Sequence, residues 1–241
     1  DINAGEWDFS VRDGKICYAL SAIKSIGRNV ILAMVRERKE NGAYTDLQNF
    51  LERMYGGELN KRAVENLIKS GAMDCIEGNR RQKMEVYSSI MDELAREQKH
   101  SMTGQYSLMD FLEGSQKDDF KISFPKVPEY EPGALLAMEK EVLGIYISGH
   151  PLEADRSLIE KNITAVSSDF IQDEETGMAR VRDQAIVTVA GMIAAKTVKT
   201  TKTNQMMAFL TLEDLRGTLE VIVFPKDYEK YRAILSPDQK I

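Results

Sequence analysis

The stretch VTVAGMI at residues 187–193, with MAFLTL at 207–212 and LEVIVF at 219–224, decides how the last quarter of this chain folds. Each run is apolar and contains β-branched residues, a composition that favours β-strands, and polar turns separate the runs. We therefore expect three consecutive antiparallel strands followed by a helix. A small barrel that begins in this way needs five strands, and the chain stops at Ile241 after three. We expect the sequence to be part of a longer protein.

Three lysines, Lys196, Lys199 and Lys202, alternate with threonine between the first two runs, where we expect a basic turn. In OB barrels, loops at this place follow the backbone of single-stranded nucleic acid, and aromatic side chains on the adjacent sheet stack on its bases. Phe209 is the aromatic residue of the second run, but strand alternation alone does not fix the face on which it lies. The alternative is a polar edge turn whose lysines prevent aggregation.

Upstream of these runs, the chain is expected to be mainly helical. Two alternating runs at 6–12 and 15–18 flank Asp13-Gly14, a dipeptide that favours the tight turn of a β-hairpin. Helical spacing of apolar residues follows at 20–26, 30–35, 45–51, 60–69 and 79–99, and it returns at 135–146 and 153–161. The first helices are short and are broken at Gly27 and at Ser70-Gly71.

Two of these breaks have the form of a helix-hairpin-helix motif. In such a motif the turn and the N-terminus of the second helix direct backbone N–H groups outward, where a DNA phosphate docks without any base contact. An ordinary pair of helices with solvated charges is the alternative. The candidate residues are Lys24, Ser25, Gly27 and Arg28 at the first turn, and Lys61, Arg62, Lys69 and Gly71 at the second.

The resulting fold class is α+β. We expect a tandem helix-hairpin-helix domain with an N-terminal β-hairpin at residues 1–99, a linker at 100–133, a helical connection at 134–184, and a partial OB domain at 185–241. The linker is polar and rich in Gly, Ser and Pro, but it contains one apolar island, QYSLMDF at 105–111. Such an island either packs back on its own domain or inserts into a partner.

Charge and cysteine content exclude little. The net charge is −6, yet the excess acid lies in residues 101–185, where 8 basic and 16 acidic residues occur, so both flanks are free to carry basic faces. Cys17 and Cys75 form no metal-binding pair and indicate free thiols in a reducing compartment. We expect a cytoplasmic chain with no membrane span and no cofactor. We also expect no metal site and no catalytic residues, because the two histidines lie far apart in the sequence and no phosphate-binding glycine loop occurs.

The chain closely resembles the alpha subunits of bacterial replicative DNA polymerase III. The resemblance rests on VRDGKI at 11–16, LSAIKSIG at 20–27, LNKRAVENLIKSGA at 59–72, the stretch from MAF at 207–209 through VFP at 223–225 and, above all, LAMEKEVLGIYISGHPL at 136–152. These stretches follow the family's order and cover nearly the whole chain.

In that family, this region carries no chemistry, and the parent protein is a DNA-directed DNA polymerase. The resemblance implies a duplex-binding helix-hairpin-helix domain, an OB domain near the single-stranded template, and a sliding-clamp motif of Gln, two residues, Leu and usually Phe. Gln105, Leu108 and Met109 match that motif, with methionine in the last place. Ser25 departs from the family's more usual glycine. The implied partners are primer–template DNA, the sliding clamp, and the rest of the polymerase chain and its holoenzyme subunits.

Two other functions stay open. OB barrels also occur in the anticodon-binding parts of aminoacyl-tRNA synthetases, and helix-hairpin-helix motifs occur in repair adaptors. Preference for tRNA over primer–template DNA would favour the first of these, and failure to replace a polymerase segment would favour the second.

Overall fold

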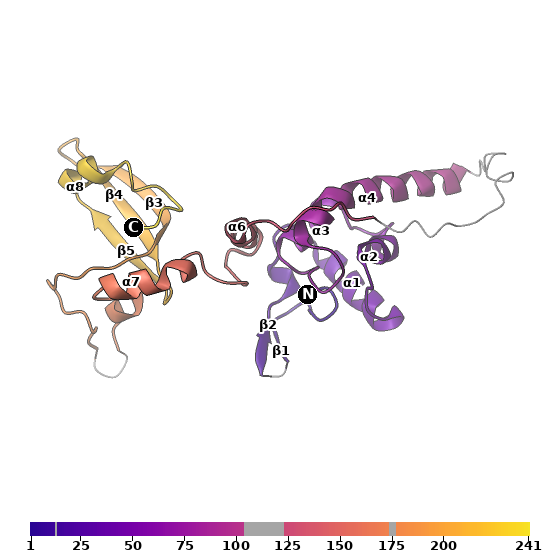
Figure 1. Cartoon of the computed structure of the whole chain (residues 1–241), viewed down its shortest axis with the longest axis horizontal. Coiled ribbons are helices and arrows are strands. Elements are labelled where there is room, and N and C mark those ends of the chain that lie inside the picture. The colour runs from indigo at the N-terminus through magenta and orange to yellow at the C-terminus, as the bar shows by residue number, and fades with distance from the viewer. Residues whose placement is uncertain (13, 104–122, 174–176) are drawn as a thin grey trace. The chain divides into compact units, whose positions relative to one another are not determined.

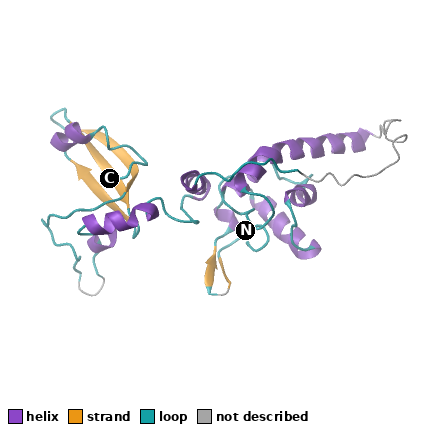
Figure 2. Cartoon of the chain, viewed as in Figure 1, coloured by secondary structure: helices purple, strands orange, loops and turns teal. Residues whose placement is uncertain are grey.

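The computed structural model describes residues 1–12, 14–103, 123–173 and 177–241 and divides into two compact units, Asp1–Ser148 and Gly149–Ile241. The first unit is mainly helical and carries a two-stranded hairpin, and the second contains a three-stranded antiparallel sheet (Figure 2). The predicted α+β class is therefore confirmed. α6 (Pro132–Leu143) belongs to the first unit, and α7 (Arg156–Asn162) belongs to the second.

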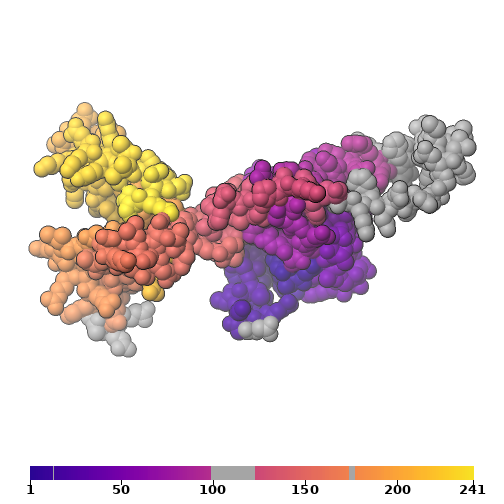
Figure 3. All heavy atoms as spheres, in the orientation of Figure 1, coloured from indigo at the N-terminus to yellow at the C-terminus, as the bar shows by residue number. Residues whose placement is uncertain are grey.

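The predicted N-terminal hairpin is present and protrudes from the first unit (Figures 1 and 3). Its strands β1 (Ser10–Arg12) and β2 (Lys15–Cys17) are antiparallel, with Val11 opposite Ile16. At its base, the rings of Phe9 and Tyr18 pack edge to face with centroids 4.8 Å apart.

The helices of the first unit begin where capping residues allow them to. The Asp46 carboxylate accepts a hydrogen bond from Asn49 N at 2.8 Å, and the Asn60 side chain accepts one from Ala63 N at 2.9 Å, which satisfies N–H groups that have no partner inside the helix. The long helix α4 runs along α3 and α2 (Figure 1). The helices other than α6 are η1 (Leu20–Ala22), α1 (Arg28–Asn41), α2 (Leu47–Met54), α3 (Lys61–Lys69) and α4 (Arg80–Thr103).

One apolar core holds this unit together. Ile31, Phe50 and Leu67 from three different helices are completely buried in it. Val142 and Leu143 at the end of α6 are buried in the same core, which fixes α6 to helices that lie far upstream in the sequence. Burial of side chains of this size contributes about 1.5–3 kcal/mol each.

A buried ionic network joins α6 to the start of α4. The Glu139 carboxylate is completely buried and accepts hydrogen bonds from Arg80 Nη1 at 3.0 Å, from Ile147 N and Ser148 N at 2.9 Å each, and from Ser148 Oγ. Burial alone would raise the pKa of Glu139, but these donors outweigh it and hold the pKa below its ordinary value. Arg80 also pairs with Asp74 at 2.7 Å.

The second unit is built around the sheet β3–β4–β5. Residues 208, 210 and 212 of the central strand face the core of this unit, where Tyr228 and Leu235 are also buried. The elements are η2 (Glu153–Asp155), α7, η3 (Ser167–Phe170), β3 (Met192–Thr200), β4 (Met206–Glu213), β5 (Thr218–Val223) and α8 (Pro225–Tyr231).

The first strand of this sheet lies later in the sequence than we predicted. β3 begins at Met192 and extends through Thr200, so Lys196 and Lys199 lie in the strand and only Lys202 lies in the turn. The apolar residues 187–190 are not in the ladder, because Thr188 O accepts instead from Thr164 N at 2.8 Å. The threonines and lysines of β3 are mostly exposed, which explains why their polar sequence resembled a turn.

The other edge of β3 is partly paired by the end of the chain. Gly191 N donates to Ile241 O, Ile193 N donates to Gln239 O, and Asp238 N donates to Ile193 O, each at 2.9 Å. A fourth extended segment therefore begins to pair with β3, on the side opposite β4, as closure of an OB-type barrel requires.

Asp214 organises the turn between β4 and β5. Its buried carboxylate accepts from Ser167 N and Ser167 Oγ at 2.6 Å each, from Arg216 N at 2.7 Å and from Gly217 N at 2.9 Å. Burial acts to raise the pKa of Asp214, but the four donors lower it below the ordinary value of 3.8.

Replacing Asp214 with asparagine is expected to lower the free energy of unfolding of the second unit by about 1–3 kcal/mol at neutral pH, since a charged acceptor is lost. Because the folded pKa is the lower one, the contribution of the carboxylate is complete above 3.8 and is lost as the pH falls through the folded pKa. Urea unfolding followed by the amide NMR signals of residues 192–223 measures the difference between the two proteins. The difference should shrink in acid; a difference that grows there would contradict this role.

Candidate nucleic-acid interfaces

The first helix-hairpin-helix turn lies between η1 and α1. Ser25 adopts a left-handed conformation there, with φ of 62°, whereas Gly27 has φ of −67° and serves as the N-cap of α1. The residue at this turn that adopts the left-handed conformation is therefore Ser25, and Gly27 does not use the conformational freedom of glycine. Ser25 takes the conformation that a glycine would take most easily, so its presence does not abolish the turn.

Three hydrogen bonds of Lys24 fix this turn to α6 and α3. Lys24 N donates to Val142 O at 2.9 Å, Lys24 Nζ donates to Glu141 O at 2.7 Å, and Lys24 O accepts from Asn66 Nδ2 at 2.6 Å. Lys24 therefore stabilises the position of the turn against α6 and α3. Its ammonium group already donates a hydrogen bond to the backbone carbonyl of Glu141.

The side of the turn that faces solvent ends at the N-terminus of α1. Gly27 supplies no side-chain cap, and the first turn of α1 contains no acidic residue, so the N–H groups of that turn and the helix dipole favour an anion. Gly27 and Arg28 are exposed, and the Arg28 guanidinium lies 5.4 Å from the centroid of the Trp7 ring. The Asn29 side chain donates to the Glu58 carboxylate at 3.1 Å.

The second turn, after α3, is filled by the protein itself. Gly71 has φ of +74°, and a side chain there would collide with Arg80, because a Cβ atom would lie 2.2 Å from Arg80 Nη2. The N-terminus of the following helix, α4, is already occupied: the Glu129 carboxylate accepts from Arg80 N at 2.8 Å and from Arg81 N at 3.2 Å. These N–H donors outweigh the effect of burial and lower the pKa of Glu129.

The basic residues of the second helix-hairpin-helix candidate, on α3, have different surroundings. Lys69 pairs with Glu65 at 2.9 Å and with Glu141 at 3.1 Å, and the hydrogen bond to Glu65 is the main reason that its pKa is raised. Lys61 pairs with Asp92 at 2.7 Å. Arg62 is exposed. The two turns are thus unequal, since the first presents an open helix N-terminus and the second contains an internal charge network.

The sheet of the second unit has one open face, and Phe209 lies on it. Phe209 alternates with the buried residues Ala208 and Leu210 and is opposite Thr197 on β3 and Ile222 on β5. Thr197 is exposed, and the side chain of Ile222 is 49% exposed. Lys199 Nζ lies 4.9 Å from the centroid of the Phe209 ring. An aromatic ring beside an ammonium group on an uncovered sheet is suited to a nucleobase and its phosphate.

The three lysines that we grouped from sequence lie in different places. Lys199 is on the open face with Phe209. Lys196 is on the core side, where its Nζ donates to Leu235 O at 2.6 Å and lies 5.1 Å from the Tyr228 ring centroid. Lys202 is exposed in the turn at 201–205. The structure thus brings together Lys199 and Phe209 but not all three lysines.

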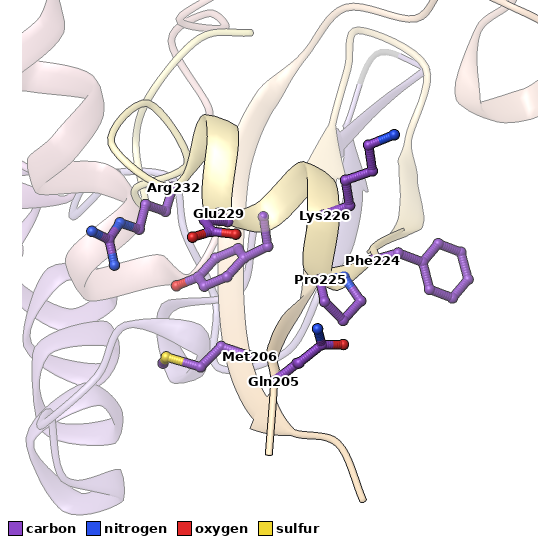
Figure 4. Close-up of a pocket in the computed structure, with 8 residues that line it drawn as sticks. Gln205, Met206, Phe224, Pro225, Lys226, Glu229 and Arg232 are labelled. Carbon is purple, nitrogen blue, oxygen red and sulfur yellow. The ribbon is translucent and has the colours of Figure 1, made fainter. Parts of the chain in front are cut away.

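A cleft of about 700 Å³ beside α8 was missed by sequence reasoning. Figure 4 shows Gln205 and Met206, at the point where β4 begins, near Pro225 at the start of α8, with Glu229 and Arg232 toward the other end of that helix. The Phe-Pro-Lys sequence at 224–226 was a signal for the helix beside this cleft, because proline is favoured at the first position of a helix.

Gln105, Leu108 and Met109 lie outside the described residues. Among the residues that are described, no group of three His, Cys, Asp or Glu side chains is arranged to hold a metal ion, and no helix has the length and apolar character needed to cross a membrane.

Two family models match parts of this chain. A family model described as a helix-hairpin-helix motif matches residues 1–83. A second model, described as an OB-fold nucleic acid binding domain, matches residues 187–241. Both domain types that we predicted from the sequence are therefore confirmed.

Curated relatives match the chain along nearly its whole length. The DNA polymerase III subunit alpha of Borreliella burgdorferi is 33% identical over 98% of this chain, and that of Deinococcus radiodurans is 34% identical over 99%. The subunit of Escherichia coli is 29% identical over 99%. The aligned regions make up 20%, 18% and 20% of those relatives, so the chain spans about a fifth of their length. Over nearly its whole length, the chain is therefore similar to one segment of DNA polymerase III alpha subunits.

Proposed function

We propose that this chain is the part of a replicative DNA polymerase that holds DNA and the sliding clamp, and that it contributes no catalytic residues. Its relatives are DNA polymerase subunits, and its two domain types bind nucleic acid. The parent polypeptide then supplies the polymerase activity in the cytoplasm, together with the other holoenzyme subunits. The shared name of the relatives favours replication over tRNA charging or a repair adaptor.

Duplex DNA is proposed to dock at the first hairpin turn. The support is the uncapped N-terminus of α1, beside the exposed residues Ser25, Gly27 and Arg28. A phosphate there would accept hydrogen bonds from backbone N–H groups and be stabilised by the helix dipole. Lys24, Lys61, Lys69 and Gly71 then have mainly a supporting role, because their contacts lie within the protein. Arg62 is left as an exposed positive charge near the second turn.

Single-stranded template is proposed to cross the open face of the sheet. The observation that carries this proposal is the position of Phe209, uncovered on the face that bears Lys199. Stacking on an aromatic ring and pairing with phosphates are both independent of base sequence, as copying of any template requires. Lys202 in the neighbouring turn adds charge along the same path, whereas Lys196 supports the core side.

Clamp binding through Gln105, Leu108 and Met109 completes the proposal. The motif follows α4 in a polar segment, so a clamp bound there would be tethered close to the DNA-binding units. Tethering raises the effective concentration of the polymerase at the primer end, and several weak contacts then sum to processive synthesis.

Replacing Phe209 with alanine is expected to weaken binding of the full chain to oligothymidylate by about 5- to 150-fold, the loss of one base-stacking platform. Fluorescence anisotropy with an oligonucleotide of about 16 nucleotides measures the affinity. Tyr231→Ala is the matched control, since Tyr231 is an exposed aromatic residue of the same unit that lies on α8 instead of the open face. Equal affinities of the two variants would contradict the assignment of this face.

A further inference from the structure

The peptide that leaves the first unit is fixed to that unit as far as Ser148, the last residue of the unit. The Glu139 carboxylate accepts hydrogen bonds from Ile147 N and Ser148 N at 2.9 Å each, and it also accepts one from Ser148 Oγ. Glu139 is itself completely buried and accepts from Arg80 Nη1 at 3.0 Å. Hydrogen bonds to an ionised acceptor are about twice as strong as neutral ones, so this carboxylate is a firm anchor for the backbone.

The second unit holds the same peptide from His150 onward. His150 Nδ1 accepts from Leu152 N at 3.1 Å, and His150 O accepts from Glu153 N at 2.9 Å. His150 Nε2 lies 3.9 Å from a carboxylate oxygen of Glu213, the last residue of β4, and the two side chains are only 18% and 17% exposed. Because Pro151 follows, the backbone of His150 is also restricted to extended conformations.

Gly149, between these two anchors, has no local need to be glycine. Gly71 and Gly144 have left-handed backbones, which favour glycine, but Gly149 does not. A Cβ atom at Gly149 would meet no other atom within 4 Å. A larger residue would therefore fit this conformation without strain or collision. What glycine alone provides here is access to many other φ and ψ values, and hence rotation about this residue.

We infer that Gly149 is a one-residue joint between the two units, and that Glu139 and His150 are positioning residues that confine rotation to it. The inference rests on the proposed binding of duplex DNA to the first unit and of single-stranded template to the second. When one unit binds a primer–template, so short a joint keeps the other unit near the adjoining part of the same DNA. The second contact is then intramolecular and has a high effective concentration.

Nitrogen NMR relaxation of the backbone amides in the full chain tests the joint. The amides through Gly149 are expected to report the tumbling of the first unit and those from His150 onward the tumbling of the second, with order parameters of about 0.85 on both sides. A single tumbling time for the whole chain would show that Gly149 is not a joint. Order parameters below about 0.6 throughout residues 145–153 would indicate a long flexible linker and would contradict the positioning role of Glu139 and His150.

The functional test inserts two glycines between Gly149 and His150, which leaves both anchors in place. The insertion lengthens the joint about threefold, and effective concentration falls roughly as the −3/2 power of length, so affinity for primer–template DNA with a single-stranded overhang should fall about 5-fold. Affinities for blunt duplex and for oligothymidylate should not change. Two glycines inserted after Gly14, in the turn between β1 and β2, are the control, because they lengthen the chain within the first unit.

His150→Phe tests the anchor on the second unit. Phenylalanine keeps an aromatic ring at this position but cannot accept the hydrogen bond from Leu152 N. The order parameter of the Leu152 amide is expected to fall below about 0.6, and affinity for the overhang DNA should fall together with it. His100→Phe is the matched control, since His100 lies in α4 and outside the joint. If His150→Phe and His100→Phe behave alike, His150 is not a positioning residue.

The three DNA probes separate this inference from the proposed function. If the insertion leaves affinity for the overhang DNA unchanged while blunt duplex and oligothymidylate both bind, the two DNA-binding units stand and the coupling through Gly149 is wrong. If neither blunt duplex nor oligothymidylate binds the full chain, the proposed function is wrong, and the coupling is wrong with it.

Discussion

Replacing Glu139 with alanine is expected to lower the free energy of unfolding of the unit Asp1–Ser148 by about 3–5 kcal/mol. The substitution leaves Arg80 buried without one of its two carboxylate partners and removes the acceptor of Ile147 N and Ser148 N. A loss of this size is a large share of the stability of an ordinary domain, which is about 5–15 kcal/mol. Denaturant unfolding followed by Trp7 fluorescence reports on this unit alone, because Trp7 is the single tryptophan of the chain.

Glu141→Ala is the matched control for this experiment. Glu141 lies two residues away on α6, but its side chain is 61% exposed and its partner Lys69 keeps Glu65. A surface pair of this kind contributes about 0–1 kcal/mol. If Glu139→Ala and Glu141→Ala destabilised the unit equally, the buried network would not be what holds α6 against α4.

The double substitution Gln105→Ala with Leu108→Ala is expected to weaken binding to the cognate sliding clamp by about 100-fold or more. An apolar anchor and a hydrogen-bonding anchor are removed together, and anchors of a short motif contribute about 2 kcal/mol or more each. Met109 keeps bulk in the last place of the motif but lacks the packing of an aromatic ring, so the starting affinity should be modest. A pull-down with the full chain and the clamp detects the loss.

Tyr106→Ala with Ser107→Ala is the control for the clamp experiment, since these residues occupy the two unspecified positions of the motif. That variant should retain clamp binding. Retention of binding by the Gln105 and Leu108 variant would remove the clamp from the proposed function, while the DNA-binding proposals would stand.

Helix positions were predictable from the sequence because their signals are local. Asp46 and Asn60 cap the helices that follow them, and Gly144, with φ of +79°, ends α6. The start of β3 was not predictable in this way. Strand formation at residues 195–200 depends on pairing with β4, and the exposed threonines and lysines there lack the apolar alternation of a half-buried strand.

The surroundings of the candidate DNA-binding residues were also not predictable, because they depend on residues that are distant in the sequence. The sequence identified charged residues at both hairpin turns, but it could not show that Glu141, which is 72 positions away, pairs with Lys69. It also could not show that Glu129 occupies the N-terminus of α4 or that Lys83 is buried with its ammonium on Met73 O and Ile76 O. These partners are brought together by tertiary packing alone. The face of Phe209 was settled in the same way, by the register of the sheet.

Competition binding to labelled primer–template DNA with a single-stranded overhang tests the central proposal most directly. Unlabelled DNA of two unrelated sequences and tRNA serve as competitors for the full chain. If the chain is the DNA-holding part of a replicative polymerase, both DNA sequences should compete equally well, tRNA should compete more weakly, and binding should weaken steeply with salt. Stronger competition by tRNA than by either DNA would contradict the proposed function.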